Sequence, residues 1–96
     1  MWIGWIEFDL LLGDVHSLKE KRAVIRPLLA ELRRFGISVA EVDHLDLHRR
    51  AGVGIGCVDA EHGHLTEVLD NAERLVAGRP EFQLLSAHRS VANSDD

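Results

Sequence analysis

The amino-acid sequence predicts an α+β domain, and two patterns carry this prediction. In several short segments apolar and polar residues alternate, which is the period of a β-strand. In two longer segments apolar residues recur three or four positions apart, which is the period of an amphipathic helix. These segments follow one another in the order β-α-β-β-α-β. We therefore expect a ferredoxin-like architecture, in which a four-stranded antiparallel sheet carries two helices on one face.

Residues 1–12 and 17–36 form the first expected strand and helix. The strand places Ile6 and Phe8 on one face and Glu7 on the other. Ser17 is a suitable N-cap for the helix, with Glu20 completing a capping box. Gly36 is a natural end, and we expect a bend at Pro27, which lacks an N–H and crowds the preceding turn. The apolar stripe of this helix comprises Leu18, Ile25, Leu28, Leu29 and Leu32.

The second half of the chain repeats this plan. Residues 37–43 and 49–59 read as strands, and residues 81–91 supply the last one. Asp59 can cap a helix that ends at Gly78. The stripe of this helix comprises Leu65, Val68, Leu69, Ala72, Leu75 and Val76, and the core face of the preceding strand comprises Ala51, Val53, Ile55 and Cys57. We expect one domain over residues 1–91 and a disordered polar tail over residues 92–96.

Length and composition limit the classes of function. The 96 residues suffice for one hydrophobic core, and a hydrophobic fraction of 46% is typical of soluble globular proteins. Glu7 and Asp9 interrupt the first apolar run, so the sequence indicates neither a signal peptide nor a membrane span. We therefore expect a cytoplasmic protein with no membrane partner. The single cysteine, Cys57, has apolar neighbours and reads as a buried, inert thiol.

The charges are unevenly distributed. A net charge of −5 argues against a protein that coats nucleic acid through bulk electrostatics. However, residues 1–50 hold eight basic and eight acidic side chains, whereas residues 51–96 hold three and eight. Cations on the first expected helix form a candidate binding face, which comprises Lys19, Lys21, Arg22, Arg26 and Arg33. This stripe is either a contact for nucleic acid or an acidic protein, or only a solvated face.

The stretch "SVAEVDHLDLHRR", residues 38–50, crowds carboxylates and imidazoles together. Strand alternation puts Glu41 and Asp43 on one face and His44 on the other. A corner of this kind could collect a divalent ion, and its candidate ligands are Glu41, Asp43, His44, Asp46 and His48. No spacing matches a defined zinc or calcium motif. The other interpretation is that the acids solvate the rim of the sheet and pair with Arg49 or Arg50.

The run "GVGIG" places three glycines on one face of a strand. A phosphate-binding loop would instead lie in a strand-to-helix turn. We expect this bare face to admit a large side chain such as Trp5, or a partner chain. A homodimer is the simplest assembly, and its expected face comprises Ile3, Trp5, Gly52, Gly54 and Gly56.

The segments "HSLKEKRAVIRPLLAELRR" and "SVAEVDHLDLHRRAGVGIG", with the opening "MWIGWIEFDL", resemble the YlxP-like family. These small bacterial proteins are grouped as a domain of unknown function. The resemblance implies a ferredoxin-like fold and a cytoplasmic protein often encoded beside translation-initiation and ribosome-maturation genes. It implies no catalytic residue, because no activity is established for the family. His48, where the family more often has an aromatic residue, and Pro27 depart from the pattern.

Together these observations favour a non-enzymatic binding module over an enzyme. We expect it to act in ribosome maturation or translation, with the basic helix face turned toward ribosomal RNA or protein, and we expect no cofactor. The alternative is a metal-dependent enzyme, or a metal or small-ligand sensor, built on Glu41, Asp43, His44 and His48.

Overall fold

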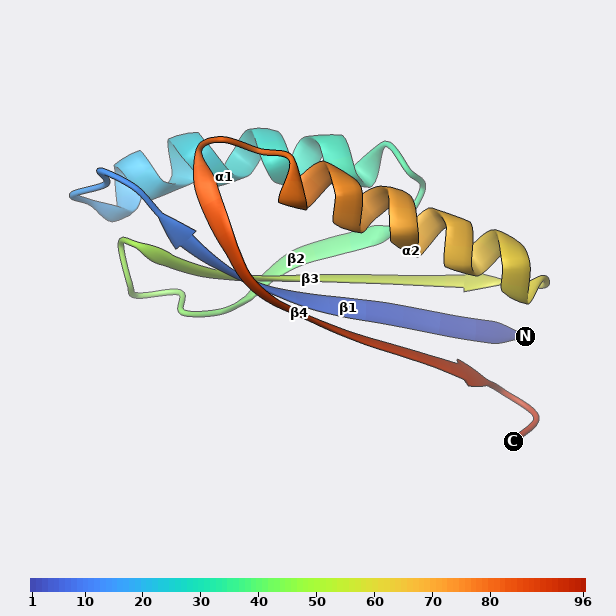
Figure 1. Ribbon diagram of the computed structural model, residues 1–96. Coiled ribbons are helices and arrows are strands. Elements are labelled where there is room, and N and C mark those ends of the chain that lie inside the picture. Colours follow the sequence, from blue (N-terminus) through green and yellow to red (C-terminus); the bar gives the residue numbers. More distant parts are fainter.

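The computed structural model describes residues 1–96 and confirms the ferredoxin-like α+β fold. Both helices lie on one face of a four-stranded sheet, and no element covers the other face (Figure 1). The elements are β1 (Trp2–Leu12), α1 (Leu18–Arg33), β2 (Ser38–Asp43), β3 (Arg50–Asp59), α2 (His62–Ala77) and β4 (Phe82–Asn93). Neither helix is long and apolar enough to cross a membrane.

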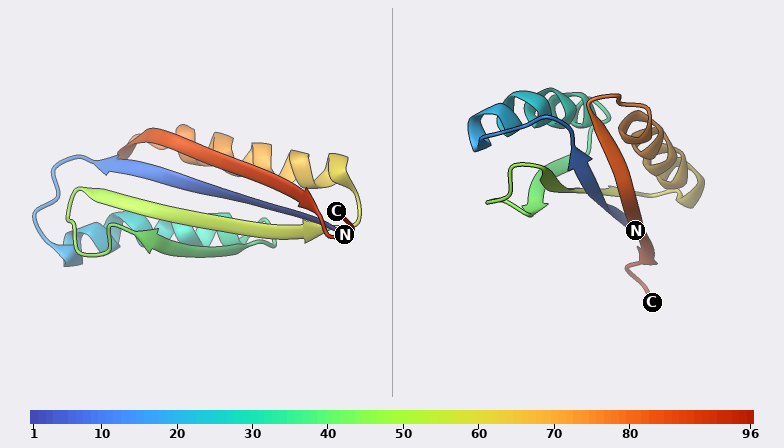
Figure 2. Two further views of the ribbon diagram at one scale, coloured as in Figure 1. Left: turned by 90° about the horizontal axis from the view of Figure 1, so that it is seen from below. Right: turned by 60° about the vertical axis from the view of Figure 1, so that its left-hand side comes forward.

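The sheet order is β2-β3-β1-β4, and every neighbouring pair is antiparallel. The two central strands are therefore β1 and β3, and the edges are β2 and β4 (Figure 2). The register places Phe8 opposite Val53 on β3 and Ala87 on β4. All three side chains point toward the helices, so this register builds the floor of the core.

The core lies between the sheet and the helices and uses the predicted stripes. Its 17 buried members are Ile6, Phe8, Leu10, Leu12, Val15, Ile25, Leu28, Leu32, Ile37, Ala51, Val53, Ile55, Leu65, Leu69, Ala72, Val76 and Phe82. Cys57 packs against this core, and desolvation raises the pKa of its thiol. This pKa direction agrees with an inert thiol, since the thiolate is the reactive form.

The two helices begin differently. At the start of α1 the Glu20 N–H donates to Ser17 Oγ at 3.1 Å, which confirms the predicted N-cap. The Glu20 carboxylate accepts the His16 N–H at 2.7 Å. The N-cap of α2 is Glu61, which makes no side-chain cap. Asp59 is therefore not the cap that the sequence predicts; its carboxylate accepts the Glu61 N–H ahead of the helix.

Two boundaries differ from expectation. α1 includes Pro27, as expected, and ends at Arg33, before the predicted end at Gly36. β4 continues through Asn93, because residues 92 and 93 still pair with β1. The Ser94 N–H then donates to the Met1 carbonyl at 2.8 Å, so the ordered part of the chain reaches beyond the expected residue 91.

Candidate functional site

Lys21 is buried and does not belong to the basic helix face that the sequence predicts. Its side chain is 3% exposed, because position 21 lies on the same side of α1 as Ile25 and Leu28. Its Nζ donates to the His44 carbonyl at 2.7 Å. The same Nζ lies 2.7 Å from Glu41 Oε2 in an ion pair without hydrogen-bond geometry. Lys21 therefore fixes α1 to the end of β2.

The other four cations of the predicted site lie on the solvent side of α1. We call them the cationic face, which comprises Lys19, Arg22, Arg26 and Arg33. All four are exposed, and no carboxylate forms an ion pair with any of them. Arg33 donates to the Val39 carbonyl at 3.3 Å, which is the only hydrogen bond of this set. The cationic face thus carries positive charge that the fold does not neutralise.

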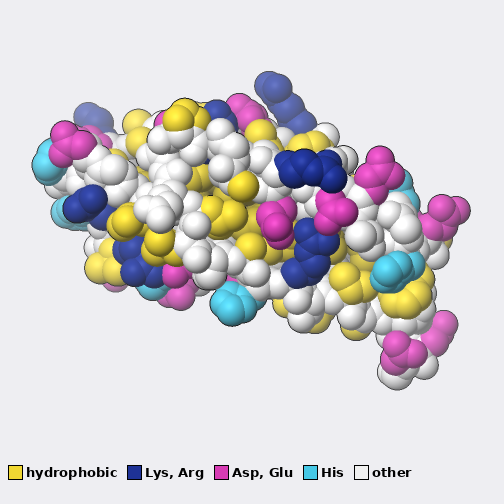
Figure 3. All heavy atoms as spheres, in the orientation of Figure 1, with side chains coloured by type: hydrophobic (Ala, Val, Ile, Leu, Met, Phe, Trp, Pro, Cys, Tyr) yellow, Lys and Arg dark blue, Asp and Glu magenta, His cyan; other side chains and the backbone are white.

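Cations elsewhere in the chain are mostly paired. Arg89 on β4 contacts Asp70 at 2.7 Å and Glu73 at 3.4 Å, both on α2. Arg79 lies 2.7 Å from Glu31. Figure 3 shows Lys and Arg side chains beside Asp and Glu side chains over α2 and β4. Asp70 and Glu73 of α2 therefore have a cationic partner within the chain, whereas the cationic face has no acidic one.

A β-bulge reshapes the corner between β2 and β3. Glu41 is opposite Val53, whereas Asp43 is opposite Gly52, so Val42 is an extra residue in β2. Glu41 consequently faces the helices and Asp43 faces the open side of the sheet. The expectation that these two carboxylates share a face is wrong, because the bulge shifts the alternation by one residue.

His44 follows the bulge with a φ of 57°, in the left-handed region where histidine occurs more often than most residues. Its N–H donates to Asp43 Oδ1 at 2.8 Å. Its ring lies on the open side of the sheet, where Nε2 is 3.5 Å from Asp9 Oδ1 and 3.4 Å from Arg50 Nη2. The His44 carbonyl thus accepts a hydrogen bond from Lys21 of α1, while the His44 ring belongs to a polar cluster on the open face.

Asp9 and Arg50 form the centre of this polar cluster. Arg50 donates from Nη2 to Asp9 Oδ2 at 2.5 Å and from Nε to Oδ1 at 3.3 Å. This hydrogen bonding holds the pKa of Asp9 below its ordinary value and raises the pKa of Arg50. Arg50 thus pairs with Asp9 of β1, and the predicted pairing of the acids of residues 38–50 with Arg49 or Arg50 is not present.

The candidate metal ligands do not converge. Glu41 lies on the helix side with Lys21, and Asp46 and His48 lie in the exposed loop between β2 and β3. Only Asp43 and His44 remain near each other, with the ring Nε2 3.9 Å from Asp43 Oδ2. No group of three or more His, Cys, Asp or Glu side chains is placed to hold a metal ion. The ligand set expected from the sequence is therefore not assembled.

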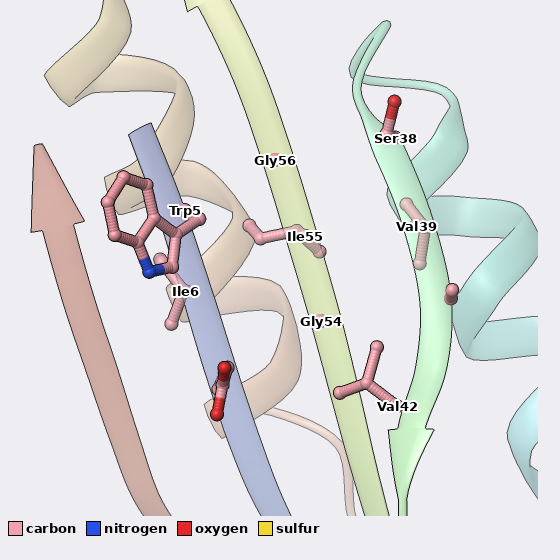
Figure 4. Close-up of a pocket in the computed structure, with 10 residues that line it drawn as sticks. Trp5, Ile6, Ser38, Val39, Val42, Gly54, Ile55 and Gly56 are labelled. Carbon is pink, nitrogen blue, oxygen red and sulfur yellow. The ribbon is translucent and has the colours of Figure 1, made fainter. Parts of the chain in front are cut away.

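The three glycines of β3 have different environments on the open face. A Cβ at Gly52 would lie 2.6 Å from Asp43 Cβ, and one at Gly54 would lie 3.0 Å from Val42 Cγ1. A Cβ at Gly56 would meet only the Gly4 carbonyl oxygen, at 3.9 Å. In Figure 4 the Trp5 indole lies over β1 on the side toward β4, away from the glycines. The expectation that Trp5 covers the glycines within one chain is therefore wrong.

Comparison with known proteins places the chain in a family. A family model described as "Protein of unknown function (DUF503)" matches residues 3–89. The chain belongs to this family. It is also 29% identical over 82 residues to the uncharacterized protein YlxP of Bacillus subtilis (strain 168), which covers 84% of this chain and 89% of YlxP. The resemblance to the YlxP-like family that the sequence motifs indicate is thus confirmed.

Among solved structures, the chain is similar to a crystal structure of a mutant form of SnoaB, described as a cofactor-independent oxygenase from Streptomyces nogalater. The two share 13% sequence identity, and the superposition has a TM-score of 0.49. It covers 99% of this chain and 94% of SnoaB.

Sequence reasoning missed the roles of two residues in this DUF503 protein. The charge of Lys21 suggests a solvent position, although it lies four residues before Ile25 and seven before Leu28, which is the spacing of a buried position. Alternation puts Asp9 on the wet side of β1, but its partner Arg50 is 41 positions away. The spacing could have identified Lys21, whereas the partner of Asp9 depends on the register of β1 and β3.

Proposed function

We propose that this protein is a non-enzymatic binding module that contacts the RNA of ribosomal particles through the cationic face of α1. One observation carries the proposal. Lys19, Arg22 and Arg26 are exposed on one side of a helix and have neither a carboxylate nor a hydrogen-bond partner in the chain. Unpaired arginines and lysines in a row are the electrostatic footprint of a phosphate-binding surface.

The dimensions of the cationic face suit a nucleic-acid strand. Lys19 and Arg33 are 14 positions apart, which corresponds to about 21 Å along a helix axis. An RNA strand carries several phosphates over this length. The exposed residues between the cations include Ala23 and Ala30, whose short side chains leave the row open to an approaching backbone.

The net charge of −5 makes the contact local. The acidic excess lies in residues 51–96, so it repels phosphate from α2 and from the end of β4 while the cationic face attracts it. Such a charge distribution orients the protein on RNA. Because the net charge is negative, long-range electrostatic attraction adds little to the affinity. The gene context that the family resemblance implies favours ribosomal particles over other RNA as the target.

Co-sedimentation with ribosomal particles tests this proposal. The wild-type protein is expected in the particle fractions at low salt and in the supernatant at moderate salt, because salt weakens phosphate contacts. Arg22→Glu and Arg26→Glu should each lower the bound fraction at low salt. Arg74→Glu is the matched control, since Arg74 is an exposed arginine on α2 that contacts only Asn71.

Absence of the wild-type protein from every particle fraction at low salt would contradict the proposal. Equal loss of binding in Arg22→Glu and Arg74→Glu would also contradict it, because only the total charge would then matter. Binding that moderate salt does not weaken would point to a protein contact instead of RNA.

A further inference from the structure

We infer that the open face of the sheet joins two copies of this chain, with Trp5 of each copy seated in a trough of the other. We call this hollow the glycine trough; its floor is Gly54 and Gly56 of β3, and Trp5 and Val42 stand on its two sides (Figure 4). It is a hollow open to solvent, with a volume of about 290 Å³. The inference concerns the side of the molecule opposite the cationic face and does not depend on RNA binding.

Gly56 has no explanation within a single chain. Glycine weakens a strand interior relative to alanine, so a strand glycine usually marks a bulge or the close approach of another group. Gly52 and Gly54 face Asp43 and Val42, which account for their lack of a side chain. At Gly56 an added Cβ would meet nothing closer than 3.9 Å. The close approach of a group from outside the chain would account for this glycine.

The shape of the open face favours a second copy of this chain as the group that approaches Gly56. Trp5 is 42% exposed although it lies on a central strand, and it projects beside the trough on the same surface. A two-fold axis that carries Trp5 into the partner's trough also returns the partner's Trp5 to this one. A self-complementary contact accounts for both features at once.

The area of the face is adequate for a dimer. Strands of 10 to 12 residues span roughly 35 Å, and four strands span roughly 19 Å, which with the shorter β2 gives a face of about 600 Å². Standard interfaces bury about 600 to 1,000 Å² per partner, so this face reaches the lower end of that range. Exposed apolar side chains continue along this face, including Val42 at 52% and Val58 at 62% exposure.

The charges on the face permit its burial. Asp9 is neutralised by Arg50 of the same chain, so it needs no cation from a partner. His44 lies near Asp43 and Asp9, so these two carboxylates each have a basic neighbour within their own chain. Glu7 is opposite His88 in the register of β1 and β4, but no ion pair joins their side chains, so the contact must leave the Glu7 carboxylate open to water.

Light scattering and sedimentation equilibrium at micromolar concentration test the inference. The wild-type protein should have twice the 10.7 kDa mass of one chain. Gly56→Val should weaken dimerisation by about tenfold or more, because the new side chain fills the trough. The Gly56→Val change should not destabilise the fold of a single chain, since a valine opposite Trp5 is a favourable cross-strand pair. Trp5→Ser should weaken the dimer similarly by removing the inserted side chain.

Gly63→Ala is the matched control. Gly63 is exposed at the start of α2, and an added Cβ there meets nothing within 4 Å, so the dimer should be unchanged. Circular dichroism of each variant reports whether the chain is folded. A monomeric mass for the wild-type protein, or a dimer that neither Gly56→Val nor Trp5→Ser weakens, would overturn the inference. Arg22→Glu should leave the mass at that of a dimer, which separates this result from RNA binding.

Discussion

The two helices have the same length and pack on the same face of the sheet, but they use their charged residues differently. Each has 16 residues and buries a stripe of apolar side chains. On α2, Asp70 and Glu73 are paired with Arg89 of β4. On α1, Lys21 is buried with Glu41, while Arg22 and its neighbours on the cationic face have no carboxylate partner.

This difference distinguishes charged residues that stabilise the fold from charged residues that do not. The apolar stripes of both helices are buried against the sheet. The buried Lys21 and the ion pairs of α2 add stability, whereas the cationic face contributes no ion pair that holds the structure together. Substitutions on the cationic face should therefore change binding without changing stability, and substitutions at paired positions should do the reverse.

The largest effect within this comparison is expected at Lys21. Lys21→Ala should lower the free energy of unfolding by about 3 kcal/mol, because it leaves the Glu41 carboxylate and the His44 carbonyl without a partner. Lys19→Ala, in the same turn but exposed, should change it by less than about 0.5 kcal/mol. Urea unfolding of both variants measures the difference. Equal effects at the two positions would show that burial of Lys21 has no energetic consequence.

A smaller effect is expected at the starts of the two helices. Ser17→Ala should destabilise the protein by about 1 kcal/mol, because Ser17 Oγ accepts the Glu20 N–H. Glu61→Ala should be close to neutral, since Glu61 makes no side-chain cap for α2. Thermal unfolding of the two variants under the same conditions tests this. A greater loss in Glu61→Ala than in Ser17→Ala would contradict the difference in capping.

The ion pair between β4 and α2 should contribute still less. Arg89→Ala is expected to lower the free energy of unfolding by about 0.5 kcal/mol, because Arg89, Asp70 and Glu73 are all partly exposed to water. The loss should shrink when salt is added, since exposed charges are screened. A loss as large as that of Lys21→Ala would show that α2 depends on ion pairs as strongly as α1 does.

The smallest effect is a pH dependence at the start of α2. A hydrogen bond from His64 lowers the pKa of Asp59, and the same bond raises the pKa of His64. The contribution of His64 to stability is fully present below its ordinary pKa of about 6.5 and is lost as the pH rises through its raised value. The contribution of Asp59 is present above about pH 4 and is lost as the pH falls through its lowered value.

The His64→Gln variant isolates this pair. Wild type should lose stability relative to His64→Gln when the pH is raised from about 5.5 to about 9, because only wild type has the protonated imidazole to lose. His48→Gln is the control, because His48 is an exposed histidine in the loop between β2 and β3 that forms no ion pair or side-chain hydrogen bond, so the wild-type pH profile should be kept. Identical pH profiles for wild type and His64→Gln would contradict the role of this pair.

The fold was predictable because periodicity alone distinguishes the strands from the helices. The stripe from Ile25 to Leu32 and the alternation around Phe8 point to the core side of each element without knowledge of the partner. The cationic face was predictable for the same reason, since Arg22 and Arg26 recur on the side opposite the stripe. Helical spacing also indicates the buried position of Lys21, but a lysine charge ordinarily favours solvent, and the two signals conflict at this position.

The corner after β2 could not be predicted from periodicity. The bulge at Val42 adds one residue, and a single extra residue exchanges the faces of every side chain that follows. The bulge also requires Gly52, because any Cβ there would collide with Asp43. The bulge in β2 thus depends on a glycine in β3. The periodicity of a single segment cannot reveal a relation between two strands.

The most direct test of the central claim is the salt dependence of RNA binding. Fluorescence anisotropy with a short labelled single-stranded RNA should give a logarithmic affinity that falls with the logarithm of the salt concentration at a slope of about −3, for four phosphate contacts. Arg22→Ala should reduce the steepness by about 0.7, and Arg74→Ala should not change it. A flat salt dependence, or the same slope in all three proteins, would contradict the assignment of the cationic face as the RNA-binding surface.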